Sequence, residues 1–349
     1  MISIALCTYN GERYLREQLE SIVLQTVVPD ELVVCDDHSS DGTLKILQEF
    51  KEKVTFAVHI FQNKKNLGST KNFEKAISLC QGNIIALCDQ DDVWKPHKLE
   101  RLMEALQANP EAGYVFSDAE IVDENLQPLG VLLWDSVGFT GEIKDSYLRG
   151  YQFRTLIKRD LVTGATLAFR KDIGKLAMPF PSGGRWIHDG WIALIASATG
   201  SRGIPVEEPL IAYRKHSKQQ IGVPSREKAE LRESSEKISL FEMYRELKKK
   251  EEQFFENWEK HGLRITSVIP SVKEKLAEIK NITNSSIMEE NLYYLREFET
   301  HFTNRRKILT SRDLNRYRLI FQEAVSGRYR QFSDSWRSMF RDIFLRKAT

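Results

Sequence analysis

Three of the six residues in Cys88–Val93 (CDQDDV) are carboxylates, and they directly follow the apolar run Ile84–Leu87. This order is typical of a buried strand that ends and presents acids at its carboxyl end. Open α/β sheets bind ligands at that edge. Neighbouring carboxylates repel one another unless a cation lies between them, and a divalent metal bridging to a phosphate is the occupant that this chemistry favours. The alternative interpretation is an acidic surface turn.

Two other expected strands also end in polar residues that suit a nucleotide. The first is followed by Thr8–Arg13 (TYNGER), and the second ends in Asp36 and Asp37. Tyr9 can lie flat against a base, and an aspartate can accept a hydrogen bond from a base N–H or a ribose hydroxyl. No GxGxxG follows the first strand, and the chain contains no Walker A sequence. We therefore expect a bound metal, and not a glycine-rich loop, to hold the phosphates.

The elements that position these residues alternate along the first 120 residues. Apolar residues at helical spacing predict helices over residues 14–24, 44–50, 69–80 and 96–108. Short apolar or alternating runs predict strands over residues 2–7, 32–35, 54–61, 84–87 and 112–116. Ser39–Thr43 and Pro96 supply helix-start residues. Alternation of this kind predicts an α/β fold, in which a mostly parallel sheet has helices on both faces.

Composition narrows the class of protein. The length of 349 residues predicts two domains, or one large domain with an appendage. The net charge of +2 creates no strong field that would favour nucleic acid as a partner. No apolar run approaches the roughly 20 residues that span a bilayer. The chain starts a strand with no basic leader, and its four cysteines form no CxxC pair, so we expect a reducing, cytoplasmic location.

Seven segments, in order and at compatible spacing, resemble a family 2 glycosyltransferase with the Rossmann-like GT-A fold. They are ISIALCTYNGERYLREQLESIVLQT, ELVVCDDHSSDGT, NLGSTKNFEKAI, IIALCDQDDVW, TGATLAFR, WIHDGWIALIASATG and EEPLIAYRKH. The resemblance covers residues 1–222. Within the family, the segments most resemble bacterial rhamnosyltransferase-like enzymes of surface polysaccharide assembly.

The resemblance implies a nucleotide-diphosphate-sugar donor (dTDP-rhamnose or a UDP-sugar), an Mg²⁺ or Mn²⁺ ion, and inversion at the anomeric carbon. The donor-binding positions of the family correspond to Thr8, Tyr9, Asp37, Asp89, Gln90 and His216, and its metal-binding positions to Asp91 and His216. Asp89-Gln90-Asp91 occupies the DxD position, and Asp36 would hold the turn. The family often has Gly, Ser or Asn where His38 stands, so His38 either changes base contacts or is an exposed turn residue.

Asp189 corresponds to the catalytic base of the family. Inverting transfer is a single displacement, in which a carboxylate takes the proton of the acceptor hydroxyl as the new bond forms. The other interpretation is a helix-start aspartate favoured by the dipole of the expected helix over residues 191–198. The implied acceptor-binding residues are Trp186, His188 and Trp191, and the two indoles are alternatively core residues. Gly164 would allow close approach of the substrate, and Arg214 or Lys215 would neutralise phosphate.

Composition changes near Pro224. We therefore divide the chain into a catalytic domain over residues 1–222 and a helical region over residues 223–349. Helical spacing recurs over residues 229–258, 272–279, 288–309 and 312–325. The last stretch, 328–347, interleaves basic with aromatic and aliphatic residues, which indicates either a membrane-surface helix or a terminal helix docked on the protein core. A lipid-linked saccharide acceptor at the inner face of the cell membrane fits the first of these interpretations.

Two other function classes remain open. A sugar nucleotidylyltransferase also uses an α/β sheet, a nucleotide and a metal, but residues 8–13 do not resemble its glycine-rich basic loop. A non-catalytic nucleotide-sugar-binding scaffold would have lost its chemistry, and the presence of Asp37, Asp91 and Asp189 argues against this. The sequence thus predicts an inverting, metal-dependent glycosyltransferase of bacterial polysaccharide assembly, which acts on a saccharide or lipid-linked saccharide acceptor.

Overall fold

The computed structural model describes residues 1–181, 187–217, 219, 258–280, 286–310, 315–332, 338–339 and 342–343. The chain divides into two compact units, Met1–Glu227 with Lys275–Ser285, and Lys228–Glu274 with Ser286–Thr349. The predicted division near residue 222 assigned residues 275–285 to the second part, whereas the structure groups them with the first. The buried Lys275 contributes to this grouping, because its ammonium donates a hydrogen bond to Met178 O (2.5 Å).

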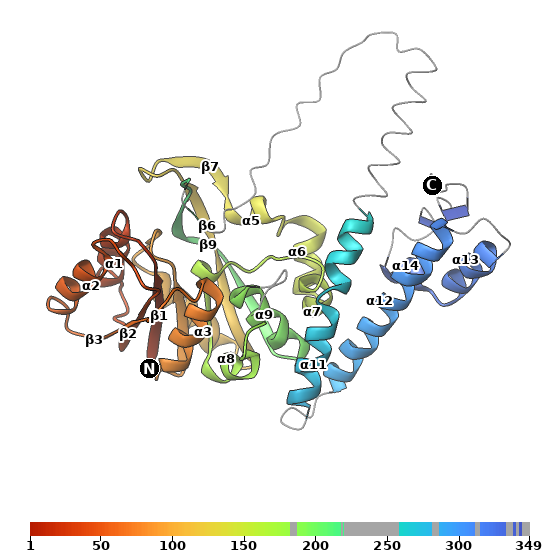
Figure 1. Ribbon diagram of the computed structural model, residues 1–349, viewed down its shortest axis with the longest axis horizontal. Coiled ribbons are helices and arrows are strands. Elements are labelled where there is room, and N and C mark those ends of the chain that lie inside the picture. Colours follow the sequence, from red (N-terminus) through yellow and green to blue (C-terminus); the bar gives the residue numbers. More distant parts are fainter. Residues whose placement is uncertain are drawn as a thin grey trace, which may run out of the picture. The chain divides into compact units, whose positions relative to one another are not determined.

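One mixed sheet forms the frame of the first unit (Figure 1). Its strands, within the described residues, are β1 (Ile2–Thr8), β2 (Glu31–Asp36), β3 (Ala57–Gln62), β4 (Ile84–Cys88), β5 (Val93–Trp94), β6 (Ala112–Val122), β7 (Pro128–Leu132), β8 (Leu167–Arg170) and β9 (Arg202–Arg214). They lie in the order β3-β2-β1-β4-β8-β6-β9-β5, and β7 pairs with β6. The first four strands pair in parallel, as do β6 and β9, whereas β8 is antiparallel to both β4 and β6. The predicted α/β fold is confirmed.

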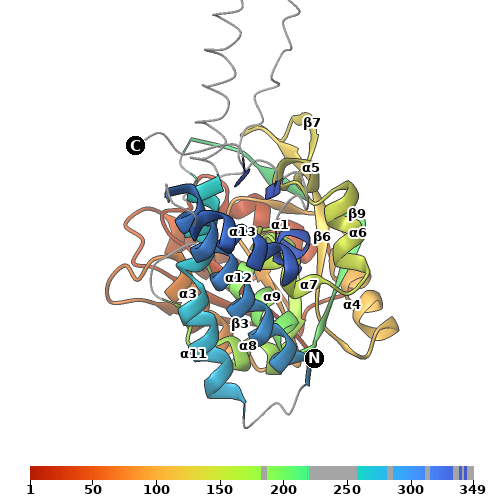
Figure 2. The same ribbon diagram turned by 90° about the vertical axis from the view of Figure 1, so that its right-hand side faces the viewer.

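Helices cover both faces of this sheet (Figures 1 and 2). They are α1 (Leu15–Val23), α2 (Thr43–Lys51), α3 (Ser69–Leu79), α4 (Lys98–Ala108), α5 (Leu133–Val137), α6 (Gly141–Leu148), α7 (Gln152–Leu156), α8 (Lys171–Ala177) and α9 (His188–Ala198), with a 3₁₀ turn, η1 (Gly164–Thr166). Leu19 of α1, Leu47 of α2 and Leu102 of α4 share one core with alternate residues of β1. α3 packs over β1 and β2 and contributes nothing to that core, so it covers the other face.

The carboxyl ends of three strands meet at one edge of the sheet. The parallel register pairs Thr8 of β1 with Asp36 of β2, and Leu6 of β1 with Cys88 of β4. The loops after β1, β2 and β4 therefore leave the sheet side by side. This places Tyr9 and the acidic turn over residues 89–92 next to each other, as the strand pattern predicted.

The second unit is helical, with α12 (Ser286–Thr310), α13 (Asn315–Val325) and α14 (Arg328–Phe332), while α11 (Ile269–Ile279) lies across the division between the units. Met339 and Ile343 pack against a core that contains Tyr329. These three residues belong to the stretch 328–347. The docking interpretation of that stretch predicts packing of this kind. Residues 333–337, 340–341 and 344–347 of that stretch lie outside the described residues, as do residues 229–257 of the helix predicted over 229–258.

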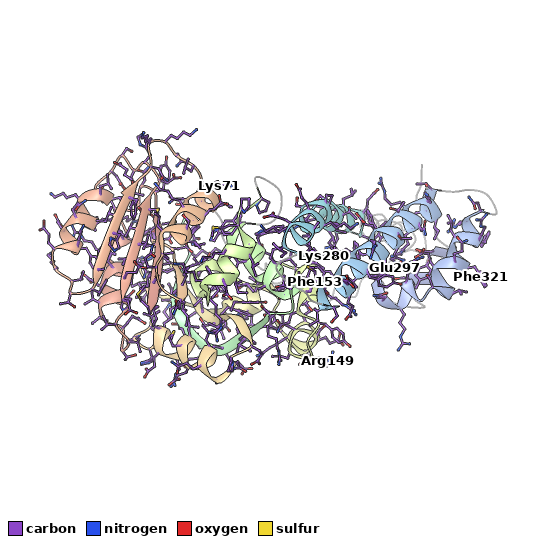
Figure 3. The ribbon with its side chains drawn as sticks, turned by 90° about the horizontal axis from the view of Figure 1, so that it is seen from below. Lys71, Arg149, Phe153, Lys280, Glu297 and Phe321 are labelled. Atoms are coloured by element: carbon purple, nitrogen blue, oxygen red, sulfur yellow. The ribbon has the colours of Figure 1, made fainter. Side chains whose placement is uncertain are left out.

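An exposed apolar stripe in this unit lies on α13. Tyr317, Phe321 and Val325 follow one another at one-turn intervals, and they are 48%, 69% and 71% exposed. Phe321 is labelled in Figure 3. In the part of the chain that the structure describes, we find no helix with the length and apolar character that crossing a membrane requires.

Leu87 and Leu129 provide a matched test of the sheet. Leu87 of β4 is completely buried, whereas Leu129 of β7 is 47% exposed. We expect Leu87→Ala to lower the free energy of unfolding by about 2–5 kcal/mol, because it leaves a cavity beneath the acidic turn. Leu129→Ala should change it by less than about 0.5 kcal/mol. Urea unfolding followed by circular dichroism measures both, and equal losses would contradict this account of the core.

Candidate active site

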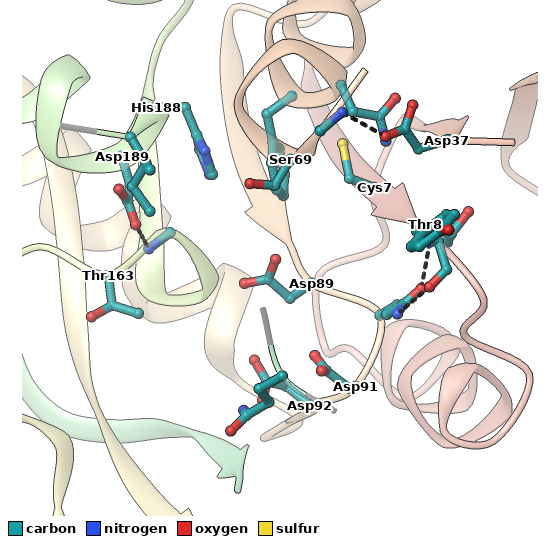
Figure 4. A pocket seen from close by; sticks show the side chains of 18 of the residues that line it. Cys7, Thr8, Asp37, Ser69, Asp89, Asp91, Asp92, Thr163, His188 and Asp189 are labelled. Atoms are coloured by element: carbon teal, nitrogen blue, oxygen red, sulfur yellow. Dashed lines mark hydrogen bonds between the residues drawn. The ribbon is translucent and has the colours of Figure 1, made fainter. Parts of the chain in front are cut away.

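A cavity of about 560 Å³ opens at the carboxyl edge of the sheet (Figure 4). Its walls are the loops after β1, β2 and β4, the starts of α3 and α9, and η1. Five carboxylates line it, and they belong to Asp37, Asp89, Asp91, Asp92 and Asp189. The described lining residues include no lysine and no arginine. Among the described residues, the wall is therefore anionic and carries no lysine or arginine to offset the charge.

Burial makes the charges of the acidic turn costly. Burial, followed by the charges of Asp91 and Asp189, raises the pKa of Asp89 to about 7. Burial also raises the pKa of Asp92 well above its ordinary value. Asp92 Oδ1 accepts a hydrogen bond from Arg214 N (3.0 Å), whereas Oδ2 is buried with no partner among the described residues. Such an oxygen is satisfied by a proton, an ordered water or a cation.

Asp91 and His216, the two predicted metal ligands, lie together. His216 Nε2 is 2.8 Å from Asp91 Oδ2, and the ring of His216 is 4.8 Å from the ring of Tyr14. His216 is not itself part of the cavity wall, so it reaches the cavity through Asp91.

The residues present fit a divalent metal that takes most of its ligands from water and substrate and few from the protein. Within the described ranges, no three His, Cys, Asp or Glu side chains gather as a metal site. Mg²⁺ in nucleotide sites commonly takes one or two carboxylates and completes its shell with waters and substrate phosphates. Asp91, with His216 beside it and the unpartnered Asp92 Oδ2 nearby in sequence, is a partial donor set of this kind.

Arg214 is committed to contacts inside the protein, so Lys215 is the one of the two residues predicted to neutralise phosphate that stays exposed. It is 1% exposed. Its Nε donates to Asp91 O (2.7 Å), its Nη1 donates to Glu124 O (2.6 Å), and its Nη2 pairs with Glu17. Arg214 therefore ties the acidic turn to α1 and to the turn after β6.

Polar side chains at the ends of β1 and β2, and in the turn after β4, hold the loops at this edge of the sheet. Thr8 Oγ1 donates to Asp36 Oδ1 (2.9 Å), and Asp36 Oδ2 accepts from Ser39 N (2.9 Å), so Asp36 holds the turn as predicted. Gln90 accepts a hydrogen bond from Tyr9 N (2.8 Å) and donates one to Tyr9 O (3.0 Å). These bonds fix the backbone of Tyr9 and leave its ring 50% exposed at the cavity.

Asp37 holds the segment that enters α3. Its Oδ1 accepts from Asn63 Nδ2 (2.7 Å) and Leu67 N (2.8 Å), and its Oδ2 accepts from Gly68 N (2.9 Å). Asn63 Nδ2 also donates to Asn72 Oδ1 (2.8 Å). Asp37 lines the cavity as predicted, but three N–H groups already engage its carboxylate. Asn63 and Asn72 were not predicted from the sequence, although Asn72 lies within the segment NLGSTKNF.

Asp189 begins α9 and lines the cavity with both carboxylate oxygens held (Figure 4). Gly190 N donates to Oδ1 and Gly164 N donates to Oδ2, each at 2.6 Å. Burial raises the pKa of Asp189 to about 6, although these two N–H groups lower it. A carboxylate fixed by backbone donors, with its pKa moved toward neutrality, suits a general base.

His188 lies against Phe73 and Gly164. Its ring stacks on Phe73 with the centroids 4.0 Å apart. Burial lowers the pKa of His188 to about 3, so the ring is neutral, and its Nδ1 has no hydrogen-bond partner within the described residues. A Cβ on Gly164 would lie 3.1 Å from His188 Nε2 and 3.2 Å from Asp189 Oδ2. The space at Gly164 thus accommodates these two side chains, whereas we had predicted space for the substrate.

Trp191 is a core residue, so its prediction as an acceptor contact is wrong. It is 2% exposed, its Nε1 donates to Ala177 O (2.8 Å), and it is not part of the cavity wall. His188 and Asp189 at the start of α9 are also buried but line the cavity, whereas Trp191 does not. Trp186 lies outside the described residues.

A buried cation behind the cavity wall escaped the sequence analysis. Lys98, the first residue of α4, is completely buried. Burial lowers the pKa of Lys98 to about 7, against the opposing effects of Cys88, Asp92 and Asp89. A signal was present, because positions 98, 102 and 106 follow at one-turn intervals and Leu102 and Leu106 face the core.

Comparison with known proteins adds a family match to this geometry. Residues 3–175 match the family model described as Glycosyl transferase family 2. The chain is 34% identical over 125 residues to an uncharacterized glycosyltransferase of Nostoc sp. PCC 7120, a match that covers 36% of this chain and 38% of that protein. It is 30% identical over 129 residues to the putative teichuronic acid biosynthesis glycosyltransferase TuaG of Bacillus subtilis, covering 37% of this chain and 50% of TuaG. The matches thus span half or less of these relatives.

A solved structure shares the fold. The crystal structure of residues 1–349 of S. aureus TarS, in complex with UDP-GlcNAc, is similar with a TM-score of 0.54. The match covers 93% of this chain and 79% of that chain at 17% sequence identity. At this identity the likeness concerns the fold alone, which is an α/β sheet with flanking helices and a helical C-terminal region.

We expect Asp37→Asn to destabilise the entry to α3. The amide would direct an NH₂ group toward N–H donors that now meet an oxygen, which should lower the free energy of unfolding by about 1–3 kcal/mol. Asp135→Asn, at an exposed position in α5, is the matched control and should cost less than about 0.5 kcal/mol. Thermal unfolding and amide exchange at Leu67 and Gly68 measure the effect. Unchanged protection of these two amides would contradict the role assigned to Asp37.

Proposed function

Since residues 3–175 of this chain belong to glycosyltransferase family 2, we propose that the protein is an inverting glycosyltransferase. It transfers a sugar from a nucleoside-diphosphate donor to a saccharide or lipid-linked saccharide acceptor during bacterial polysaccharide assembly.

The observation that carries the proposal is the charge of the cavity wall. Five aspartates line the cavity, and its described lining residues include no lysine and no arginine. A nucleoside diphosphate is itself anionic, so this wall would repel it unless a cation lies between the two. We propose that Asp91, with His216 beside it, holds Mn²⁺ or Mg²⁺. A metal bound there would offset the charge of the diphosphate leaving group.

Two residues support binding of the nucleoside part of the donor. The ring of Tyr9 is 50% exposed at the cavity, and its flat face suits a base. The carboxylate of Asp89 also lines the cavity, where it can accept a hydrogen bond from a ribose hydroxyl or from a metal-bound water. Thr8, Asp37 and Gln90 act on the donor through the loops that they hold in place.

Asp189 supports the transfer step. The proton of the acceptor hydroxyl passes to the Asp189 carboxylate while the acceptor oxygen bonds to the anomeric carbon. The bond between that carbon and the diphosphate oxygen breaks on the opposite face of the sugar, and the nucleoside diphosphate leaves with the electron pair. Gly164 N and Gly190 N keep the carboxylate oriented. His188 is neutral, so it contributes shape and hydrogen bonding to the acceptor and no charge.

The names of similar proteins support the substrate class at a coarse level. TuaG is named for teichuronic acid biosynthesis, and the TarS structure contains UDP-GlcNAc. For this chain we propose a UDP-sugar or a dTDP-sugar such as dTDP-rhamnose. We also propose that it works on the cytoplasmic side, at the inner face of the cell membrane where the acceptor is lipid-linked.

A thermal-shift screen of UDP-, dTDP- and GDP-sugars, with and without Mn²⁺, tests the proposal. A donor at about 100 times its Kd should stabilise the protein by about 2.7 kcal/mol, and only when Mn²⁺ is present. Asp91→Ala should remove this metal-dependent shift. Stabilisation that needs no metal would contradict the assignment of Asp91, and donor binding without hydrolysis or transfer would favour a non-catalytic scaffold. Pyrophosphate release from an NTP and a sugar phosphate would instead identify a nucleotidylyltransferase.

Asp189→Asn should keep donor binding and lose about 10²- to 10⁴-fold in kcat, because the amide cannot take a proton. Asp172→Asn, which alters an exposed first-turn aspartate of α8, is the matched control and should keep the rate. In the unaltered protein the working form is the carboxylate, and burial raises the pKa of Asp189 to about 6. Transfer should therefore rise with pH, reach half of its maximum near this pKa, and level off above it. A rate that falls between pH 5 and 7 would contradict the assignment of the base.

A further inference from the structure

Lys98 joins the two sides of the cavity from behind its wall. Its side chain is completely buried, and its ammonium nitrogen lies 3.4 Å from the centre of the Trp94 ring. The same nitrogen donates a hydrogen bond to Ala165 O (2.7 Å). Lysine is almost never fully buried unless it is paired, so these contacts and the nearby acids must offset the loss of hydration.

The contact with Ala165 leads directly to the proposed base. Ala165 and Gly164 are consecutive residues of η1, and Gly164 N donates to Asp189 Oδ2 (2.6 Å). The turn is closed by a hydrogen bond from Thr166 N to Thr163 O (2.9 Å). The ammonium of Lys98 therefore binds Ala165 of this short turn, and Gly164 of the same turn binds the carboxylate of Asp189.

Lys98 also interacts with the donor side of the cavity. The acids Asp92 and Asp89 favour its cationic form. Both belong to the acidic turn that follows β4, and η1 packs on β4. A methionine would fill a similar volume without the cost of burying a charge. It would, however, neither bind the Ala165 carbonyl nor offset the acids.

We infer that Lys98 is a positioning residue, which holds η1 against the acidic turn and thereby sets the distance between the proposed base and the donor. The inference rests on the proposed function for its kinetic consequence. Without the ammonium, Ala165 O loses its partner and η1 is released. A displacement of about 1 Å in a catalytic group can cost about 10²-fold in rate.

Lys98→Met, Lys98→Arg and the control Lys95→Met test this inference in the full chain. Lys95 lies one turn earlier in the same segment, but its side chain is 43% exposed and pairs with Glu120. We expect Lys98→Met to speed amide exchange over residues 163–166 and to lower kcat by at least about tenfold, while the Kd for UDP or dTDP with Mn²⁺ changes less than about threefold. Lys98→Arg should keep amide exchange and kcat close to their wild-type values, and Lys95→Met should leave both unchanged.

Wild-type exchange and wild-type kcat in a folded Lys98→Met protein would overturn the inference. The inference would also be overturned if nucleotide binding weakened by the same factor as kcat. In that case the substitution would act on the acidic turn alone and not on η1. If Lys98→Met does not fold, Lys98→Gln replaces it, and a wild-type kcat in that variant would overturn the inference. If the wild-type protein neither hydrolyses nor transfers any nucleotide sugar, the proposed function is wrong. The amide exchange rates of residues 163–166 would then still test whether Lys98 holds η1 in place.

Discussion

Repulsion among the aspartates at one edge of the sheet is the constraint on which the rest of the structure depends. The parallel register that stabilises β1, β2 and β4 also forces their acidic ends together. The chain relieves part of this repulsion itself, since turn N–H groups engage Asp36 and Asp37 and a buried ammonium lies behind the wall. The remaining charge of the acidic turn faces the cavity, where it favours ligands that arrive with a cation.

The cavity wall combines distant stretches of the chain, and Tyr213 and Gln219 complete it. Most of the wall comes from residues 7–92, which supply the proposed donor side, and from residues 163–189, which supply the proposed base. They meet because β8 pairs antiparallel with β4, which brings η1 against the strand that ends in the acidic turn. The antiparallel pairing of β8 with β4 is therefore the feature that brings the proposed base and the proposed donor side into one cavity.

The features predicted correctly from the sequence are those that depend on residues close together in the chain. Strands, their polar ends and the turn held by Asp36 were predicted correctly, because apolar runs and turn-forming residues act over a few positions. His38 is an exposed turn residue with a φ of 68°, a conformation that suits the Gly or Asn common in the family. The contacts of Arg214 were not predicted, because its partners come from distant segments. Trp191 was misassigned because every residue of α9 is buried. The sequence pattern of such a helix does not distinguish residues that line the cavity from residues of the core.

Hydrogen bonds within the protein hold the loop that carries Tyr9. Gln90 fastens the Tyr9 backbone from two sides while half of the ring stays exposed, so stacking a base would cost little further chain entropy. Gln90 can approach this closely only because Gly11 has no side chain, since a Cβ there would lie 2.3 Å from Gln90 Oε1. The proposed nucleotide binding at this loop thus depends on the space that Gly11 leaves for Gln90.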